Sequence, residues 1–308
     1  MNYSQLYNNI QAYAENTEQL FVANIPVFVQ EAEERIYNSV QIPSLRKNVT
    51  GTATANNKYL SLPNDWLSNY SMAIVEPNGN YDYLLNKDVN FIREAYPAPT
   101  TTGMPRYYAL FGSQYGNINE MSLILGPSPD QNYTVEMHYY YYPPTIIQGQ
   151  ITGTGSLNGG SLYTNGVYQN VTLSGGSGNG AIADIVIIGQ TIVSCNITFG
   201  GQFYVVGDIL TVPNTSIGNS GSGFSISVAA ITNTNGQSWL GDNYDPVLFY
   251  GAMREAMIFM KGEADMVGYY EQKYQEALDQ LRRLGDGLER GDAYRDGQLK
   301  INVSRAGV

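Results

Sequence analysis

The side chains best suited to catalysis are few and isolated in this chain of 308 residues. The one histidine, His138, lies within the run YTVEMHYYYY at 133–142. It has no partner at the spacing of a metal-binding or general-base motif, so we interpret it as a residue on one face of a strand. The one cysteine, Cys195, lies in an apolar run, and no second histidine exists to activate it. This pattern indicates a small core residue rather than a nucleophile.

Carboxylates are the remaining groups that could do chemistry. Asp184 and Asp208 are the pair that we would test as the acid and base of a glycosidase, although no spacing rule connects them. Asp242, Asn243 and Asp245 resemble the start of a calcium loop, but the glycine and the closing glutamate of that loop are absent. Helix capping explains these three residues better. We therefore predict a protein that is not an enzyme and that has no cofactor, no metal and no catalytic residue.

The composition favours a protein that works inside an assembly. Tyrosine is abundant, with 26 residues, charged residues are only 14%, and no lysine or arginine occurs between Arg106 and Arg254. Tyrosine offers a large contact area with few rotatable bonds, which is typical of protein interfaces. The net charge of −11 argues against binding to nucleic acid phosphates, but it is compatible with a wall past which DNA slides. No apolar run of about eighteen residues occurs, so no membrane partner is expected.

Two kinds of apolar spacing predict the elements of the first half. Residues 3–15 have helical spacing. Asn24 as a cap and Pro26 in the first turn predict a second helix, which places Glu33 on its polar side. Between 46 and 142 the period shifts towards two, and clusters of proline, asparagine and glycine separate the runs. This part of the chain therefore predicts antiparallel strands joined by turns.

The segment at about 244–284 predicts one long amphipathic helix. Its apolar residues recur in steps of three or four, and charged residues fall mostly between them. A helix of about forty residues is on the order of 60 Å long, so we expect a strut that reaches past its own domain or packs beside copies of itself. Gly285 is expected to end the helix. Gly262 and Gly268 indicate either the close approach of a neighbouring helix or a bend, and the sequence does not decide between them.

Residues 149–236 differ abruptly from their surroundings. They hold 18 of the 33 glycines together with strand-length apolar runs, among them 203–206 and 224–230. A linker lacks such runs, so we predict an all-β domain inserted in a loop of a discontinuous core that consists of 1–148 and 237–308. The predicted fold class is α+β, with long amphipathic helices, a small antiparallel β part and the inserted glycine-rich domain.

The last residues contain a short run of period two, QLKINV at 298–303. A free terminal strand of this kind can pair with the edge of another chain's sheet. A frayed tail is the alternative interpretation.

Three segments carry a resemblance to a known family. They read ANIPVFVQEAEERIY at 23–37, LFYGAMREAMIFMKGEAD at 248–265 and RGDAYRDG at 290–297, and the shorter stretches 41–43, 139–144 and 274–278 accompany them. In this order they resemble the head-to-tail adaptor proteins of tailed bacteriophages, especially those of short-tailed and marine phages. The resemblance covers most of 1–148 and 237–308, whereas 149–236 departs from the compact family pattern.

The resemblance implies a structural virion protein of the neck, assembled in the bacterial host cytoplasm. Such adaptors form a ring, usually of twelve copies, beneath the portal, extend the DNA channel used for ejection, and present a platform to a tail nozzle or tail fibre protein. DNA would pass through without specific binding. The C-terminal segment of relatives reaches into the portal, which makes the following residues candidates for docking here: Arg290, Arg295, Leu299, Ile301 and Val303. Adaptable side chains on the long helix are candidates for the ring interface: Met253, Met257, Met260, Tyr270 and Tyr274.

Two other functions remain open from the residues alone. A tail-associated receptor-binding or glycan-binding structural protein would use the glycine-rich and tyrosine-rich region at 149–236. A cell-wall-degrading virion enzyme would rest only on the unpaired carboxylates.

Overall fold

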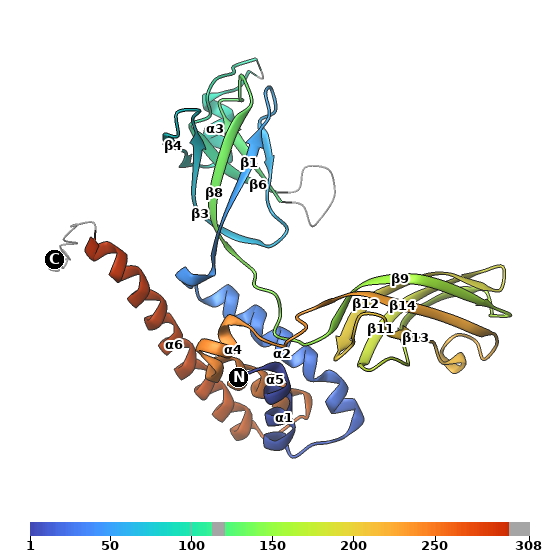
Figure 1. Cartoon of the computed structure of the whole chain (residues 1–308). Coiled ribbons are helices and arrows are strands. Elements are labelled where there is room, and N and C mark those ends of the chain that lie inside the picture. The colour runs from blue at the N-terminus through green and yellow to red at the C-terminus, as the bar shows by residue number, and fades with distance from the viewer. Residues whose placement is uncertain (99, 113–120, 296–308) are drawn as a thin grey trace. The chain divides into compact units, whose positions relative to one another are not determined.

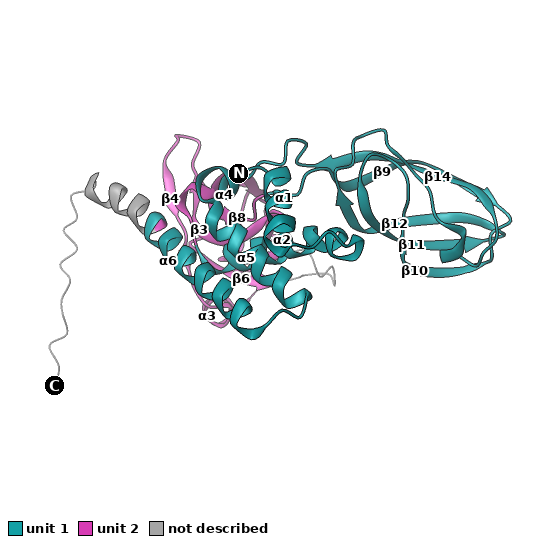
Figure 2. Ribbon diagram, turned by 90° about the horizontal axis from the view of Figure 1, so that it is seen from below, with its two compact units in different colours: residues 1–40, 144–284 teal, residues 41–143, 285–308 magenta. Residues whose placement is uncertain are grey.

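The computed structural model describes residues 1–98, 100–112 and 121–295, and it divides the chain into two compact units. The first unit comprises 1–40 and 144–284, and the second comprises 41–143 and 285–308 (Figure 1, Figure 2). Helices and mostly antiparallel sheets occur together, as the predicted α+β class requires. Within the described part of the chain, no helix combines the length and apolar character needed to span a membrane.

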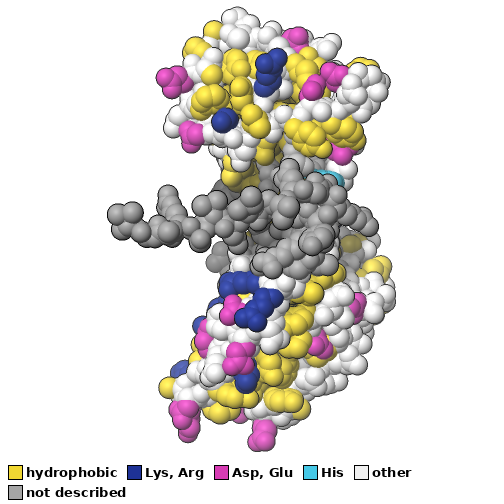
Figure 3. Space-filling view, turned by 90° about the vertical axis from the view of Figure 1, so that its left-hand side faces the viewer, with side chains coloured by type: hydrophobic (Ala, Val, Ile, Leu, Met, Phe, Trp, Pro, Cys, Tyr) yellow, Lys and Arg dark blue, Asp and Glu magenta, His cyan; other side chains and the backbone are white. Residues whose placement is uncertain are grey.

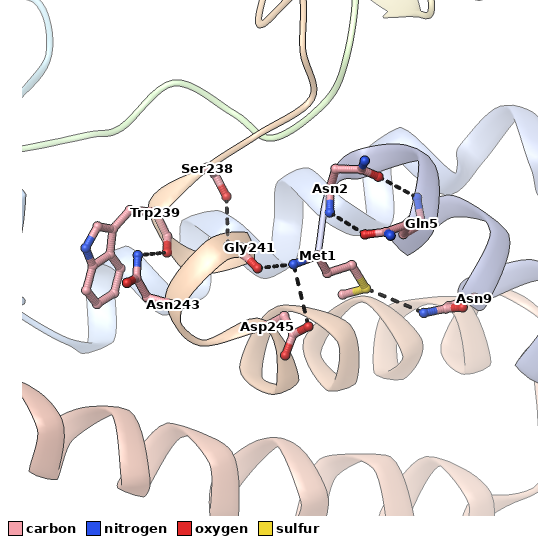
Figure 4. A network of polar contacts seen from close by, with 9 residues as sticks. All are labelled: Met1, Asn2, Gln5, Asn9, Ser238, Trp239, Gly241, Asn243 and Asp245. Atoms are coloured by element: carbon pink, nitrogen blue, oxygen red, sulfur yellow. Dashed lines mark hydrogen bonds and ion pairs between the residues drawn. The ribbon is translucent and has the colours of Figure 1, made fainter.

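The first unit contains five helices in its described part, the last of which continues beyond the unit's final residue, 284: α1 (Tyr3–Ala14), α2 (Gln19–Ser39), α4 (Trp239–Asn243), α5 (Asp245–Phe259) and α6 (Ala264–Arg295). The Asn2 side chain and Gln5 form a capping box that starts α1. The amino group of Met1 donates to the Gly241 carbonyl and lies 3.7 Å from the Asp245 carboxylate, which connects the start of α1 to α4 and α5 (Figure 4).

The predicted start of the second helix is wrong. The helix α2 begins at Gln19, before the expected cap at Asn24, and Pro26 lies inside it. The Asn24 side chain donates instead to the Leu20 carbonyl, 2.7 Å away, one turn back in the same helix. Phe21 is buried near the start of α2, so tertiary packing extends the helix beyond its local signals.

The prediction of one continuous long helix is also wrong. The segment divides into α5 and α6 at a turn where Lys261 adopts a left-handed backbone conformation, with φ of 53°. The amide of Gly262 donates to the Met257 carbonyl and that of Lys261 to the Ile258 carbonyl. This pattern is a Schellman motif, which ends a helix. Neither Asn243 nor Asp245 caps α5 with its side chain, and α6 continues past Gly285, so the predicted caps at both ends are wrong as well.

The helices α2, α5 and α6 pack around a glycine that the sequence did not single out. A Cβ atom at Gly251 would lie 3.0 Å from the Ala32 Cβ on α2 and 3.3 Å from the Tyr274 ring on α6. The absence of a side chain at Gly251 therefore permits the close approach of three helices. Gly268, by contrast, faces open space.

The first unit also contains two three-stranded sheets, here called the β-module. Their orders are β10-β11-β12 and β13-β14-β9, and the strands are β9 (Gln150–Ser161), β10 (Gly166–Thr172), β11 (Asn179–Ile188), β12 (Thr191–Gln202), β13 (Ile209–Leu210) and β14 (Ser222–Thr232). A 3-10 turn, η2 (Asn214–Ser216), interrupts the loop before β14. Apolar side chains from both sheets share one core. The predicted strand at 203–206 is wrong, because Phe203 has a φ of 61° and its ring packs against that of Tyr3 on α1.

The second unit packs two four-stranded sheets face to face. One has the order β1-β8-β3-β4: β1 (Arg46–Ala53), β8 (Tyr133–Tyr141), β3 (Trp66–Val75) and β4 (Tyr81–Tyr83). The other has the order β2-β7-β6-β5: β2 (Tyr59–Ser61), β7 (Ser122–Gly126), β6 (Tyr107–Gly112) and β5 (Leu85–Asn86). The turn η1 (Pro43–Leu45) precedes β1, and α3 (Val89–Ala95) packs on β6 and β7.

Candidate functional site

The turns α1–α2 and α5–α6 meet at one end of the helices, and exposed apolar side chains gather there. The Asn16 amide lies 3.4 Å from the Met260 sulfur, and the Phe259 ring packs on Phe28 with 5.2 Å between ring centroids. We call the exposed apolar residues around these two turns the turn-end patch: Leu20, Ile258, Phe259 and Met266, with exposed fractions of 68, 45, 40 and 44%. An exposed apolar cluster on a helical end is typical of a protein contact.

The five predicted ring-interface residues lie along α5, α6 and the turn between them, mostly inside the chain. Met253, Met257, Tyr270 and Tyr274 are buried, and only Met260 is partly exposed. Side chains that one chain already buries add little new contact area on assembly, because that area is no longer in water. The helical periodicity found the packed face of α5 and α6, whereas the exposed residues of the patch lie beside it.

An ionic network holds the three helices in one arrangement. Arg35 on α2 lies 2.7 Å from the Glu255 carboxylate on α5, and Arg254 lies 2.6 Å from the same carboxylate. The Arg254 Nε also donates to Glu271 on α6. Charged residues of this segment were expected mostly on the polar face, but Glu255 is 9% exposed, so it is a buried charge with two cationic partners. The network fixes the geometry of the bundle that carries the turn-end patch.

The outer surface of α6 is mixed in character. The space-filling view shows apolar side chains between acidic and basic ones over the helical part of the molecule (Figure 3). Tyr269 and Leu284 are apolar residues exposed on α6, while Lys273 pairs with Glu276 one turn away. Such a surface suits a contact that includes both apolar burial and charge pairing.

Glu33 is a second acidic residue that is buried although it was predicted to face solvent. It was expected on the polar side of α2, yet its side chain is 4% exposed. The Thr145 hydroxyl and the Ile146 amide donate to its carboxylate at 2.6 and 2.8 Å. Burial raises the pKa of Glu33 to about 7, and the two hydrogen bonds oppose the shift only in part. Glu33 thus joins α2 to the segment that follows β8.

The residues considered for chemistry have structural environments. Burial raises the pKa of the Cys195 thiol to about 11, which opposes formation of the nucleophilic thiolate. His138 lies on the exposed face of β8 opposite Asn48, as predicted for a strand residue. Among the described residues, no group of three or more histidine, cysteine or acidic side chains is placed to hold a metal ion.

Asp184 and Asp208, the pair considered as a glycosidase acid and base, each hold a different turn. Asp184 accepts a hydrogen bond from the Asn170 amide at 2.9 Å. Asp208 accepts from the Ser177 hydroxyl at 2.6 Å and from the amides of Ser177 and Val205. The bond from the Ser177 hydroxyl is the main cause of a pKa of Asp208 below its ordinary value. A glycosidase acid needs the opposite shift, so this environment does not favour that chemistry.

The side chains of the predicted portal-docking residues lie outside the part of the chain that the structure describes. Leu299, Ile301 and Val303 lie outside the described residues. Arg290 and Arg295 lie within the helical backbone of α6, but their side chains are also outside the described part of the chain. Their role stays a prediction.

Comparison with known protein families matches residues 1–171 to the family described as SU10 adaptor protein. The matched part is more than half of the chain and spans α1, α2, residues 41–143 of the second unit, and the β-module as far as β10. The segments 248–265 and 290–297 lie beyond it. A search of curated proteins gave no match.

Proposed function

Because the chain belongs to the SU10 adaptor protein family and is thus a phage structural adaptor protein, we propose that it forms a ring below the portal. The ring, of about twelve copies, extends the DNA channel and docks a tail nozzle or tail fibre protein. The family match over 1–171 is the observation that carries this proposal. The protein is a virion component, and the proposed place is the neck, with assembly in the cytoplasm of the bacterial host.

The turn-end patch supports the ring contact. A ring closes through a heterologous interface, in which one surface of each copy meets a different surface of the next. Leu20, Ile258 and Met266 expose apolar area that such a contact would bury, and Met260 beside them offers an adaptable side chain. We therefore place the ring contact at the patch, and Met253, Met257, Tyr270 and Tyr274 support it from beneath.

Charge and the tail support the other two roles. A net charge of −11 repels DNA phosphates, so DNA would pass through the ring without specific binding. The end of α6 carries Arg290 and Arg295, and the sequence continues with the apolar series Leu299, Ile301 and Val303; we assign these residues to the portal. The β-module, which contains two charged residues, is proposed to lie on the outside of the ring.

The test of the proposed function is assembly with purified portal protein. Negative-stain microscopy should show rings attached to portals, and absence of association at any salt concentration would refute the proposal. Deletion of 297–308 should abolish attachment while circular dichroism shows an unchanged fold. Unchanged attachment would exclude the docking role of the tail.

A matched pair of variants tests the ring contact. Leu20→Glu places a charge on the turn-end patch, whereas Ile188→Glu places the same charge at a residue of the β-module that is 64% exposed. Closed rings seen by negative-stain microscopy should be lost for Leu20→Glu and persist for Ile188→Glu. Deletion of 150–235 should leave rings intact if the β-module is an insertion, and saccharide binding by the full chain would instead favour a glycan-binding role.

A further inference from the structure

The second unit has an open seam between the edge strands of its two sheets. β1 ends one sheet and β2 ends the other. Between them lies a groove of about 370 Å³ whose lining is mainly apolar, and we call it the seam: Val49, Gly51, Leu60, Leu62, Val135 and Met137. Val49 is 37% exposed although it faces the interior side of its sheet, so the core of this unit is incompletely covered here.

β1 is an edge strand without the usual protection. In the described part of the chain it pairs only with β8, so alternate amide and carbonyl groups along its other side have no strand partner. All residues from Lys47 to Thr52 are exposed. Charged residues occur only at its start, Arg46 and Lys47, and the strand contains no proline. Such an edge is a template for another strand.

Gly51 leaves a gap at the centre of the seam. Its partner on β8 is Val135, and the partner of Val49 is Met137, so Val49 and Gly51 lie on the face of β1 that looks into the core. A Cβ atom placed on Gly51 would meet no other atom within 4 Å. Gly51 is exposed, so this open space beside the apolar lining gives room for a side chain from elsewhere.

We propose that residues 298–303 of a second copy bind the seam as an added strand on β1. This inference rests on the proposed ring and names a contact between its copies that exists before portal protein binds. Leu299, Ile301 and Val303 recur at every second position, the spacing at which side chains of one strand point to one face. Their side chains fill the seam, while Lys300 and Asn302 face outward.

The position of the segment suits donation to another copy. α6 is described as far as Arg295, and the segment 298–303 follows three residues later in the sequence. Each copy gives one strand and receives one, which is a heterologous contact of the kind that closes rings. Main-chain hydrogen bonds supply affinity in such a complex, and the alternate apolar side chains supply specificity.

The seam and the portal compete for the same residues. A single strand of six residues pairs with one edge at a time, so the seam holds the tail when portal is absent, and portal protein releases it. The seam thereby also covers the exposed edge of β1 before the virion is assembled, which limits uncontrolled pairing between chains.

A labelled peptide with the sequence of 296–308 tests the seam directly by fluorescence anisotropy. The receptor is the full chain carrying Ile301→Asp, which disables its own tail. Binding should be saturable, and the additional change Gly51→Val should weaken it at least tenfold because valine fills the gap. In the receptor, Thr52→Val lies on the opposite face of β1 and should leave peptide binding unchanged. In the peptide, Asn302→Asp should also leave binding unchanged, whereas Ile301→Asp should abolish it.

A mixing experiment tests exchange between copies. A chain with Gly51→Val can donate its segment 298–303 to another copy but cannot bind one in its own seam. A chain with Ile301→Asp can bind the segment of another copy but cannot donate its own. In a Leu20→Glu background each variant alone should be monomeric in sedimentation velocity, and an equimolar mixture should form a 1:1 complex.

Any one of three results would refute the proposal that 298–303 binds the seam. The first is no peptide binding, and the second is that the Gly51→Val chain binds the peptide as tightly as the chain with Gly51, with an unchanged circular dichroism spectrum and melting temperature. The third is no complex in the mixture. Loss of peptide binding with portal rings intact would refute the seam alone. Loss of portal rings with peptide binding intact would refute the proposed function alone.

Discussion

Replacing Glu33 with glutamine should remove a pH dependence that the fold of the first unit creates. The folded protein holds this carboxyl at a pKa of about 7, against an ordinary value of 4.5. A raised carboxyl pKa means that the folded state binds the proton more tightly than the unfolded state does. Its stabilising effect is therefore complete below about pH 4.5 and is lost as the pH rises to 7.

The magnitude follows from the size of the shift. At about 1.4 kcal/mol per pKa unit, a rise from 4.5 to about 7 corresponds to roughly 3 kcal/mol of unfolding free energy lost between pH 4.5 and pH 8. Glutamine is uncharged and of the same shape as the protonated acid. Its oxygen can accept from the Ile146 amide, and its nitrogen can donate to the Thr145 hydroxyl. At pH 8 the variant should therefore be more stable than the natural chain.

The assay is denaturant unfolding at pH 5, 6, 7 and 8, followed by the fluorescence of Trp239 in a Trp66→Phe background. These are the two tryptophans of the chain, and Trp239 belongs to the first unit. Glu34→Gln, which alters the exposed neighbouring carboxylate, is the control and should change the pH profile only slightly, because the Glu34 charge is the smallest of the causes that shift the Glu33 pKa. If Glu33→Gln has the same pH profile as the natural chain, the reasoning about this buried carboxyl is refuted.

Three further predictions concern local features of the first unit. Lys261→Gly should raise the unfolding free energy by about 1 kcal/mol, because glycine adopts the left-handed conformation without strain. Gly251→Val should lower it by about 1–3 kcal/mol through overpacking against Ala32, whereas Gly268→Ala, in open space, should raise it by up to about 1 kcal/mol. Denaturant unfolding measures all three variants. Cys195, with a pKa raised to about 11, should react with a thiol reagent at pH 7 only after unfolding, and rapid labelling of the native chain would contradict its burial.

Local patterns predicted the kinds of elements better than their ends. The alternation at 133–142 predicted β8, and the helical spacing at 3–15 predicted α1, because one face of each element is buried against the rest of its unit. The break at Lys261 was missed because the apolar spacing continues across the turn, and a non-glycine residue occupies the left-handed position. Gly262 did indicate the break, but from the sequence it was equally compatible with a bend and with the close approach of a neighbouring helix.

The candidate site depended on information that spacing does not carry. A period of three or four residues identifies the face of a helix that is buried, but it does not tell whether the partner is the same chain or another copy. It therefore led to Met253 and Tyr274, which this chain buries itself, and not to Leu20, which it leaves in solvent. The burial of Glu33 and Glu255 likewise depends on partners far away in the sequence, at Thr145 and Arg35.

The path of the chain through the first unit determines when that unit can fold during synthesis. α2 ends at Ser39, but its packing partners α5 and α6 begin at Asp245 and Ala264. The ribosome adds about 5–20 residues per second, so the more than 200 residues between them take roughly 10–40 seconds to appear. Residues 41–143 are complete well before then. We therefore expect residues 41–143 to fold first on the nascent chain. The apolar face of α2 stays without its packing partners during that time and is an early target for chaperones.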